Sequence, residues 1–208
     1  AAECNRFSSA IFRRKKRRAG EKTDMLVFKY TKIDGAEFFS HLDLLKHFCK
    51  IMRRGGIDIT ESKGFNPHMH VYMNAPMGVG IKSLCEYCFV DSNEPASVFM
   101  QKFNEHTVRG VTCLSAVDVA KKVSVAGIIT EALYKISGLN KFDVAEVLNA
   151  ENFMLTDKNG VDKDLKARIK NMYFEGDELM ARLGFGNETL RADAFSNKLC
   201  KAYGGEVK

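Results

Sequence analysis

Two histidines in the first third of the chain have the setting for acid–base chemistry. His41 stands in the first turn of an expected helix, and His68 follows Asn66-Pro67 in an expected turn. An imidazole titrates near neutral pH, so two imidazoles in one pocket could act as general acid and general base. By analogy with endoribonucleases built from paired ferredoxin-like domains, the catalytic hypothesis is a metal-independent endoribonuclease that uses His41 and His68. It requires both rings to lie together on one exposed surface.

The same region allows two other interpretations. His68 and His70 are two positions apart, so on a strand they would share a face and could hold a metal ion with His41. No cysteine or carboxylate stands beside them at ligand spacing, so we expect an exposed histidine on an Asn-Pro turn and no metal. His41 alone could bind a phosphate, because a helix N-terminus attracts anions.

The cysteines predict structural roles in a reducing compartment. They are scattered along the chain: Cys4, Cys49, Cys85, Cys88, Cys113 and Cys200. Cys85 and Cys88 form a lone CxxC on an expected strand, where the two thiols would point to opposite faces. Without a second pair we expect buried cysteines rather than a zinc or iron–sulfur site. With no secretory signal and no apolar run of membrane-spanning length, we expect a cytoplasmic location.

Glu86 is the one acidic residue in a clear strand at 83–90. In regular alternation it shares a face with Leu84, Cys88 and Val90. If that face is buried, the carboxylate needs a partner, and Arg53 or Arg54 is the expected one.

Motifs for common cofactors are absent from the sequence. Gly78-Val79-Gly80 lacks the third glycine of a dinucleotide loop, and no P-loop, HExxH or nucleophile elbow occurs. We therefore expect no cofactor, and we favour a protein that is not an enzyme.

The best-defined element is a helix over residues 42–54. Ser40 at the N-cap and Asp43 three residues later predict its start in the manner of a capping box. Leu45, Phe48, Cys49 and Met52 give it an apolar stripe, and Gly55-Gly56 predicts its end.

The order of elements predicts an α+β protein with two parts. In residues 25–120 we expect, in chain order, a strand at 26–32, a helix at 42–54, strands at 57–61, 69–74 and 83–90, a helix at 95–106 and a strand at 111–117. With 57–61 and 69–74 as one bent strand, this is the ferredoxin-like βαββαβ pattern. After a linker at 121–127, residues 128–208 predict a smaller α+β subdomain: strand 128–137, helix 142–149, strand 152–157, a hairpin of 167–174 and 178–185, and helix 190–203.

Positive charge is concentrated at the start of the chain. Residues 1–24 hold eight Lys or Arg and three acids, whereas the other 184 residues hold 24 and 23. The leader has two interpretations, an arm that grips phosphates and an extension that stays disordered, with Met25 as the natural start. We favour the second.

Short motifs in the first part are similar to the signature of one bacterial family: Ser40-His41-Leu42-Asp43, Arg53-Arg54, Gly64-Phe65-Asn66-Pro67-His68, Gly78-Val79-Gly80 and Glu86-Tyr87. Because of these motifs, the chain resembles the radical SAM-linked protein family over about residues 25–203. This family is a domain of unknown function that occurs alone or at the C-terminus of radical S-adenosylmethionine proteins. Met69 and Ala192 depart from the pattern, since proline is usual at both. The three-cysteine cluster motif of radical SAM enzymes is absent, so we do not expect the chain to be such an enzyme itself. The resemblance implies a radical SAM protein as a partner, and it assigns no catalytic residue.

These observations lead to a function hypothesis with two alternatives. We expect a non-enzymatic accessory module that binds RNA, either tRNA or rRNA, or a radical SAM protein, because open sheets of ferredoxin type often read single strands. The alternatives are the endoribonuclease and the metal-binding protein described above. The expected contact residues are His41, Arg53, Arg54, Lys63, Phe65, Asn66 and His68.

Overall fold

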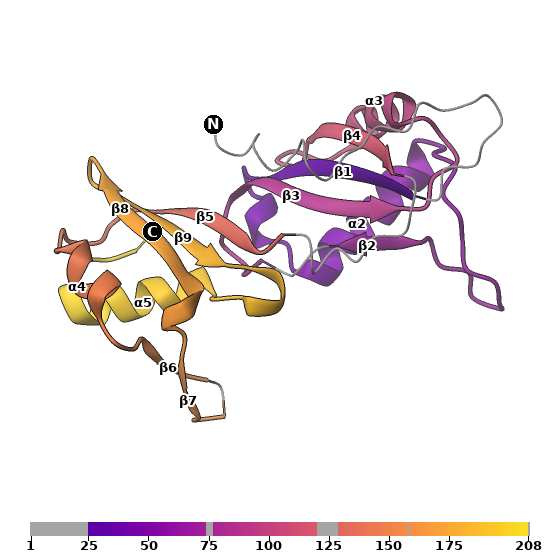
Figure 1. The fold of residues 1–208 in the computed structure, drawn as a ribbon. Coiled ribbons are helices and arrows are strands. Elements are labelled where there is room, and N and C mark those ends of the chain that lie inside the picture. Colours follow the sequence, from indigo (N-terminus) through magenta and orange to yellow (C-terminus); the bar gives the residue numbers. More distant parts are fainter. Residues whose placement is uncertain (1–24, 74–76, 120–128, 158, 208) are drawn as a thin grey trace. The chain divides into compact units, whose positions relative to one another are not determined.

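The computed structural model describes residues 25–73, 77–119, 129–157 and 159–207 (Figure 1). The chain divides into two compact units, one up to residue 125 and one from residue 126. Both are mixed α/β with antiparallel sheets. The leader at 1–24 and the linker at 121–127 lie outside the described residues.

The described residues of the first unit form a four-stranded antiparallel sheet with two α-helices. Its elements are β1 (Met25–Lys32), the short 3₁₀ helix η2 (Ala36–Phe38), α2 (His41–Arg54), β2 (Val71–Met73), β3 (Ser83–Val90), α3 (Ala96–His106) and β4 (Cys113–Val119). The strand order is β2-β3-β1-β4, so β1 and β3 are central. Since both helices bury side chains against the same face of β1, they form one layer over the sheet.

An aromatic cluster joins the sheet to both helices. The ring centroid of Phe28 on β1 lies 5.6 Å from that of Phe48 on α2. It lies 5.1 Å from the centroids of Phe99 and Phe103 on α3. All four side chains are fully buried, and removing one such ring from a packed core costs about 3–5 kcal/mol.

The predicted signals at both ends of α2 are confirmed. The Ser40 hydroxyl oxygen accepts a hydrogen bond from the Asp43 amide at 3.2 Å and donates one to its carboxylate at 2.6 Å. The helix begins at His41, one residue earlier than expected, and ends at Arg54, with Gly55 as its C-cap. Gly56 then takes a positive φ of 56°, a conformation that favours glycine.

The strand expected at 57–61 is wrong. This segment makes only isolated bridges, Ile59 with Ser92 and Glu61 with Met69. It runs beside the loop after β3 and not beside β3 itself, so it has no continuous ladder. The strand expected at 69–74 is β2, which is shorter, at Val71–Met73.

The second unit has one three-stranded sheet, a short hairpin and two helices among its described residues. Its elements are β5 (Glu131–Ile136), α4 (Val144–Asn149), β6 (Met154–Thr156), β7 (Asp162–Asp164), η4 (Lys166–Arg168), β8 (Ile169–Glu175), β9 (Glu178–Gly184), η5 (Gly186–Glu188) and α5 (Ala192–Tyr203). The order is β5-β9-β8, and β6 pairs with β7. The β8–β9 hairpin confirms the turn expected at 175–177, whereas β7 was not expected.

Candidate functional site

His41 and His68 lie at opposite ends of the first unit. α2 begins at His41, near the end of the sheet where β1 finishes and β3 starts. It finishes near the other end, where the Thr60 amide donates to the carbonyl of Asp91, just past β3. The loop with His68 extends from this second end (Figure 1). Because a 14-residue helix is about 20 Å long, the two imidazoles share no pocket.

His41 also faces away from the exposed side of α2. It is half-buried, and Phe48 and Met52 follow it at i+7 and i+11, which is the buried side of the helix. The expectation of a single surface formed by His41 and the Asn66-Pro67-His68 turn is therefore wrong.

Residues 61–69 form a stapled loop whose tip is exposed. The Ser62 amide donates to the His68 carbonyl at 2.8 Å, and the His68 amide donates to the Ser62 hydroxyl oxygen at 3.0 Å. Lys63, Asn66 and His68 are exposed, and Phe65 at the tip is wholly exposed. Four of the expected contact residues thus come together in one loop.

His70 has a structural partner. Its Nδ1 lies 2.8 Å from Oδ2 of Asp91, and both side chains are partly buried. This contact ties the foot of the loop to the segment after β3. Within the described part of the chain, no group of three or more His, Cys, Asp or Glu side chains could hold a metal ion.

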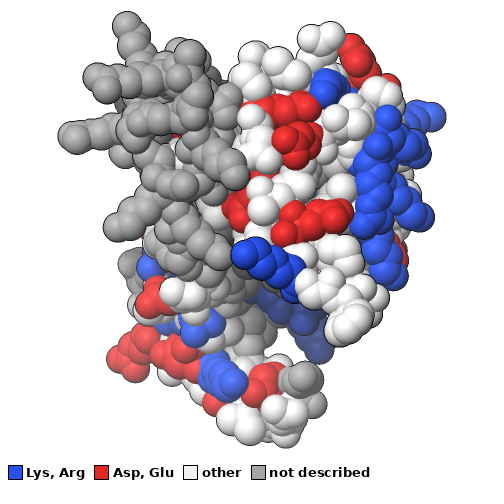
Figure 2. Space-filling model, turned by 90° about the vertical axis from the view of Figure 1, so that its right-hand side faces the viewer, with Lys and Arg blue, Asp and Glu red and all other residues white. Residues whose placement is uncertain are grey.

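Four cations occupy the outer side of α2, which we call the α2 basic face. Lys46, Lys50, Arg53 and Arg54 are exposed, and their spacing of i, i+4, i+7 and i+8 places them on one side of the helix. Figure 2 shows Lys and Arg side chains gathered in a band, apart from the acidic ones. Asp43 is the only acid in α2, and it lies 3.7 Å from Lys46.

This basic face is a local feature and not an effect of net charge. Residues 25–119, which span the described part of the first unit, hold ten Lys or Arg and ten Asp or Glu and so carry no net charge. Four of these ten cations stand on one helix face. A surface of this kind attracts phosphates, because the field depends on how charge is distributed as well as on its sum.

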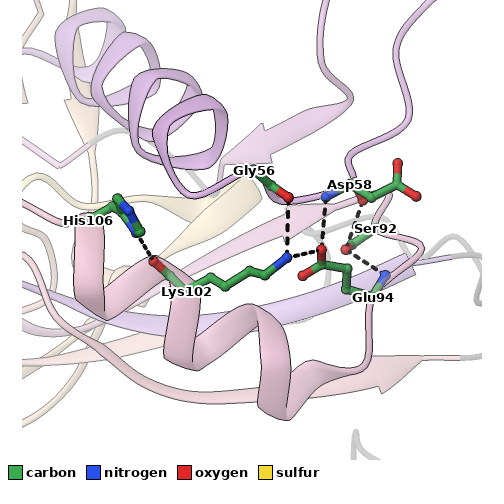
Figure 3. A network of polar contacts seen from close by, with 6 residues as sticks. All are labelled: Gly56, Asp58, Ser92, Glu94, Lys102 and His106. Carbon is green, nitrogen blue, oxygen red and sulfur yellow. Dashed lines mark hydrogen bonds and ion pairs between the residues drawn. The ribbon is translucent and has the colours of Figure 1, made fainter.

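A polar network fixes the C-terminal end of α2 against α3 (Figure 3). Lys102 on α3 donates to the Gly56 carbonyl at 3.3 Å and to Oε1 of Glu94 at 2.5 Å. The same Glu94 oxygen accepts from the Asp58 amide at 3.3 Å. Arg54 donates to the His106 carbonyl at 2.8 Å, so one cation of the basic face is held in place. Apart from the position of Glu94 before the helix, no local pattern predicted this network.

Glu86 is buried, and its expected partner is wrong. The residue is 5% exposed, whereas Arg53 and Arg54 are exposed on the outer side of α2. Its charged neighbour is Lys32, and its Oε1 has no hydrogen-bond partner among the described residues. Burial raises the pKa of the Glu86 carboxyl to about 7, although a hydrogen bond from Ser83 and the charge of Lys32 oppose the rise.

A bulge explains why the expected face of β3 was partly wrong. Tyr30 is opposite Glu86 and Lys32 is opposite Ser83, so two steps on β1 match three on β3. The side chains of Ser83 and Glu86 therefore both point inward. Leu84, which was expected on the face of Glu86, is 71% exposed.

The burial of the cysteines agrees with the expectation in part, and Cys4 lies outside the described residues. Cys88 is fully buried and Cys113 nearly so, whereas Cys85 is half-buried. Burial raises the pKa of the Cys88 thiol and raises that of Cys113 to about 12. Both thiols therefore stay protonated and behave as small core side chains.

The fold and site define a mixed α/β protein whose residues 25–119 carry no net charge but present one basic helix face and one exposed aromatic loop. The chain belongs to a family described as an uncharacterized protein conserved in bacteria (DUF2344), whose model matches residues 25–192. No curated protein matches the chain. Among the described residues, no helix is long and apolar enough to cross a membrane.

Proposed function

We propose that this protein is an RNA-binding accessory module that contacts the phosphate backbone through the α2 basic face. The observation that carries the proposal is the placement of Lys46, Lys50, Arg53 and Arg54 on one side of a well-packed helix, although residues 25–119 as a whole carry no net charge. Buried side chains such as Phe48 and Ile51 hold the helix against the sheet, so the cations are presented from a rigid element.

Contacts of this kind predict a defined salt dependence. Each phosphate neutralised on a single strand contributes about −0.7 to the slope of log K against log salt, so four contacts give roughly −3. A protein that bound RNA by apolar contacts alone would show almost no slope. The slope therefore reports how many cations of the α2 basic face are engaged.

The arrangement of the first unit supports the same proposal. We propose that it is a ferredoxin-like domain, an inference supported by its element order and by the central positions of β1 and β3. Open sheets of this type bind single-stranded RNA in other proteins through the sheet face that the helices leave uncovered, so the fold analogy supports RNA binding in general and the α2 basic face is supported by its charges alone.

Filter binding of total tRNA at low and moderate salt tests the proposal. The charge-reversal variant Lys50→Glu/Arg53→Glu is compared with Arg109→Glu/Lys201→Glu, which reverses two exposed cations outside the α2 basic face. We expect salt-sensitive binding that the first variant loses and the second largely retains. Equal loss of tRNA binding in both variants would show that only the net charge of the protein matters. If the unaltered protein retains no tRNA on the filter at low salt, the RNA proposal is wrong.

We further propose a link to radical SAM proteins, which is supported only by the motif resemblance. Affinity capture of the full chain from its host, with radical SAM proteins identified by mass spectrometry, tests the link. Absence of any radical SAM protein above an untagged control would count against it.

The endoribonuclease alternative gains no support from the geometry. A general acid and a general base must both reach one reacting bond, and His41 and His68 stand at opposite ends of α2. The metal-binding alternative likewise lacks a ligand group within the described ranges.

A further inference from the structure

We propose that the loop at residues 61–69 presents Phe65 as a stacking platform for an unpaired nucleobase, so that the RNA is recognised through single-stranded or bulged nucleotides. The inference rests on the proposed RNA-binding function and names the kind of RNA. It assigns a role to a loop that the α2 basic face does not explain.

The first observation is that the loop is built to hold its tip outward. Its two sides are joined by the bridge between Glu61 and Met69 and by the two hydrogen bonds between Ser62 and His68. At its foot the His70 amide donates to the Thr60 carbonyl at 3.0 Å. Figure 1 shows the loop projecting from the rest of the unit. The tip is therefore presented by fixed backbone contacts at the base of the loop.

The second observation is the complete exposure of Phe65. Its relative exposure is 107%, the highest among the exposed large apolar side chains of the described residues. A phenylalanine gains stability only by burying its ring, so this side chain contributes nothing to folding through packing. A ring that has no folding role and stands on a stapled tip is available to a ligand.

The third observation is what surrounds the ring. Lys63, Asn66 and His68 are exposed beside it, and the other tip positions are Gly64 and Pro67. A nucleobase needs one aromatic face for stacking, polar groups for its edges and a cation for its phosphate. A protein partner would instead favour several apolar side chains around the anchor.

Acidic side chains at the foot of the loop limit where phosphate can lie. Asp58 and Glu61 are exposed there, whereas Asp91 is partnered by His70. Phosphate is therefore disfavoured at the foot and is better placed near Lys63. This arrangement fits a base inserted at the tip more than a duplex backbone lying along the whole loop.

A fluorescence experiment tests the inference directly. The chain contains no tryptophan, so Phe65→Trp introduces a single reporter at the tip. The probes are a 16-nucleotide unstructured RNA, within the usual range of single-domain sites, and the same strand annealed to its complement. We expect the single strand to quench the reporter and the duplex to quench it much less. Phe38→Trp is the matched control, because Phe38 is also exposed, at 68%, near the start of α2.

Affinity measurements separate this inference from the proposed function. Stacking on one base predicts that Phe65→Ala weakens single-strand binding by about five- to 150-fold and leaves duplex binding almost unchanged. If Phe65→Ala binds like the unaltered protein while Lys50→Glu/Arg53→Glu loses binding, the inference is overturned and the proposed function stands. Equal quenching at Phe65→Trp and Phe38→Trp would also overturn the inference. If the unaltered protein binds neither RNA at low salt, both fall.

Discussion

Tyr30 and Glu86 are direct partners across β1 and β3, and both are buried on the face that α2 covers. Burial and the nearby Glu86 carboxylate raise the pKa of the Tyr30 phenol well above its ordinary value. Burial also lowers the pKa of Lys32, an effect that the charges of Glu86 and Glu37 oppose. Titratable side chains are thus enclosed at one end of a core that consists mainly of aliphatic and aromatic side chains.

The protonation of Glu86 predicts a pH dependence of stability. Its carboxyl has a pKa of about 7 in the folded protein, above the ordinary value of 4.5. The folded state therefore binds the proton more tightly, and stability falls as pH rises from about 4.5 to about 7 and then levels off. The shift corresponds to roughly 3 kcal/mol.

Glu86→Gln provides the test, because glutamine resembles the protonated carboxyl at every pH. In urea unfolding we expect the variant to be more stable than the unaltered protein at pH 8 and equally stable near pH 4.5. Glu61→Gln, at an exposed position, is the matched control and should change neither value. A Glu86→Gln protein that is less stable at pH 8 would show that the ionised carboxylate is favourable in the fold.

The polar network beside α2 predicts that Lys102 and Glu94 are coupled in their contributions to the free energy of unfolding. Glu94 is mostly buried, so Lys102→Met leaves a carboxylate that has lost its ion pair. We expect a loss of roughly 1–3 kcal/mol in the free energy of unfolding, as for other buried groups that lose a partner. The double variant Lys102→Met/Glu94→Gln should recover much of it. Additive losses in this double-mutant cycle would mean that the pair is not coupled.

The start of α2 allows a third prediction. Ser40→Ala removes the hydroxyl that caps the Asp43 amide, and the usual cost of losing such a cap is about 1 kcal/mol. Ser40→Asn keeps an acceptor at the same position and should stay close to the unaltered protein. Thermal unfolding of the three proteins at one pH measures both differences. Equal midpoints for the alanine and asparagine variants would show that the cap contributes no stability.

Local signals predicted α2 well, because the information lies within the helix. Ser40 and Asp43 marked its start, Gly55-Gly56 marked its end, and Phe48 and Met52 belong to its buried stripe. The basic face follows from the same periodicity. Arg53 and Arg54 were expected contacts, whereas Lys46 and Lys50 were not among them, since the joint role of the four cations depends on the charge of the residues around the helix.

Contacts that are distant in sequence could not be predicted in the same way. The expected face of Leu84 was wrong because the bulge shifts the register of β3 against β1. The shared surface of His41 and His68 was wrong because the direction of α2 along the sheet places the two residues at opposite ends. In both cases the sequence fixes residue types but carries no local signal for register or direction.

The contact between His70 and Asp91 makes a last prediction about the exposed loop. This contact ties the foot of the loop to the segment after β3, and the hydrogen bonds of Ser62 and His68 lie beyond it. Removing it in His70→Ala should let the loop open more often, because its other ties are few and exposed. Amide hydrogen exchange should then become faster at Ser62 and His68, while amides in α2 keep their rates. His47→Ala, which removes a ring stacked on Phe39, is the control and should leave the loop unchanged. Unchanged exchange at Ser62 and His68 in His70→Ala would show that the loop holds its shape without this tie.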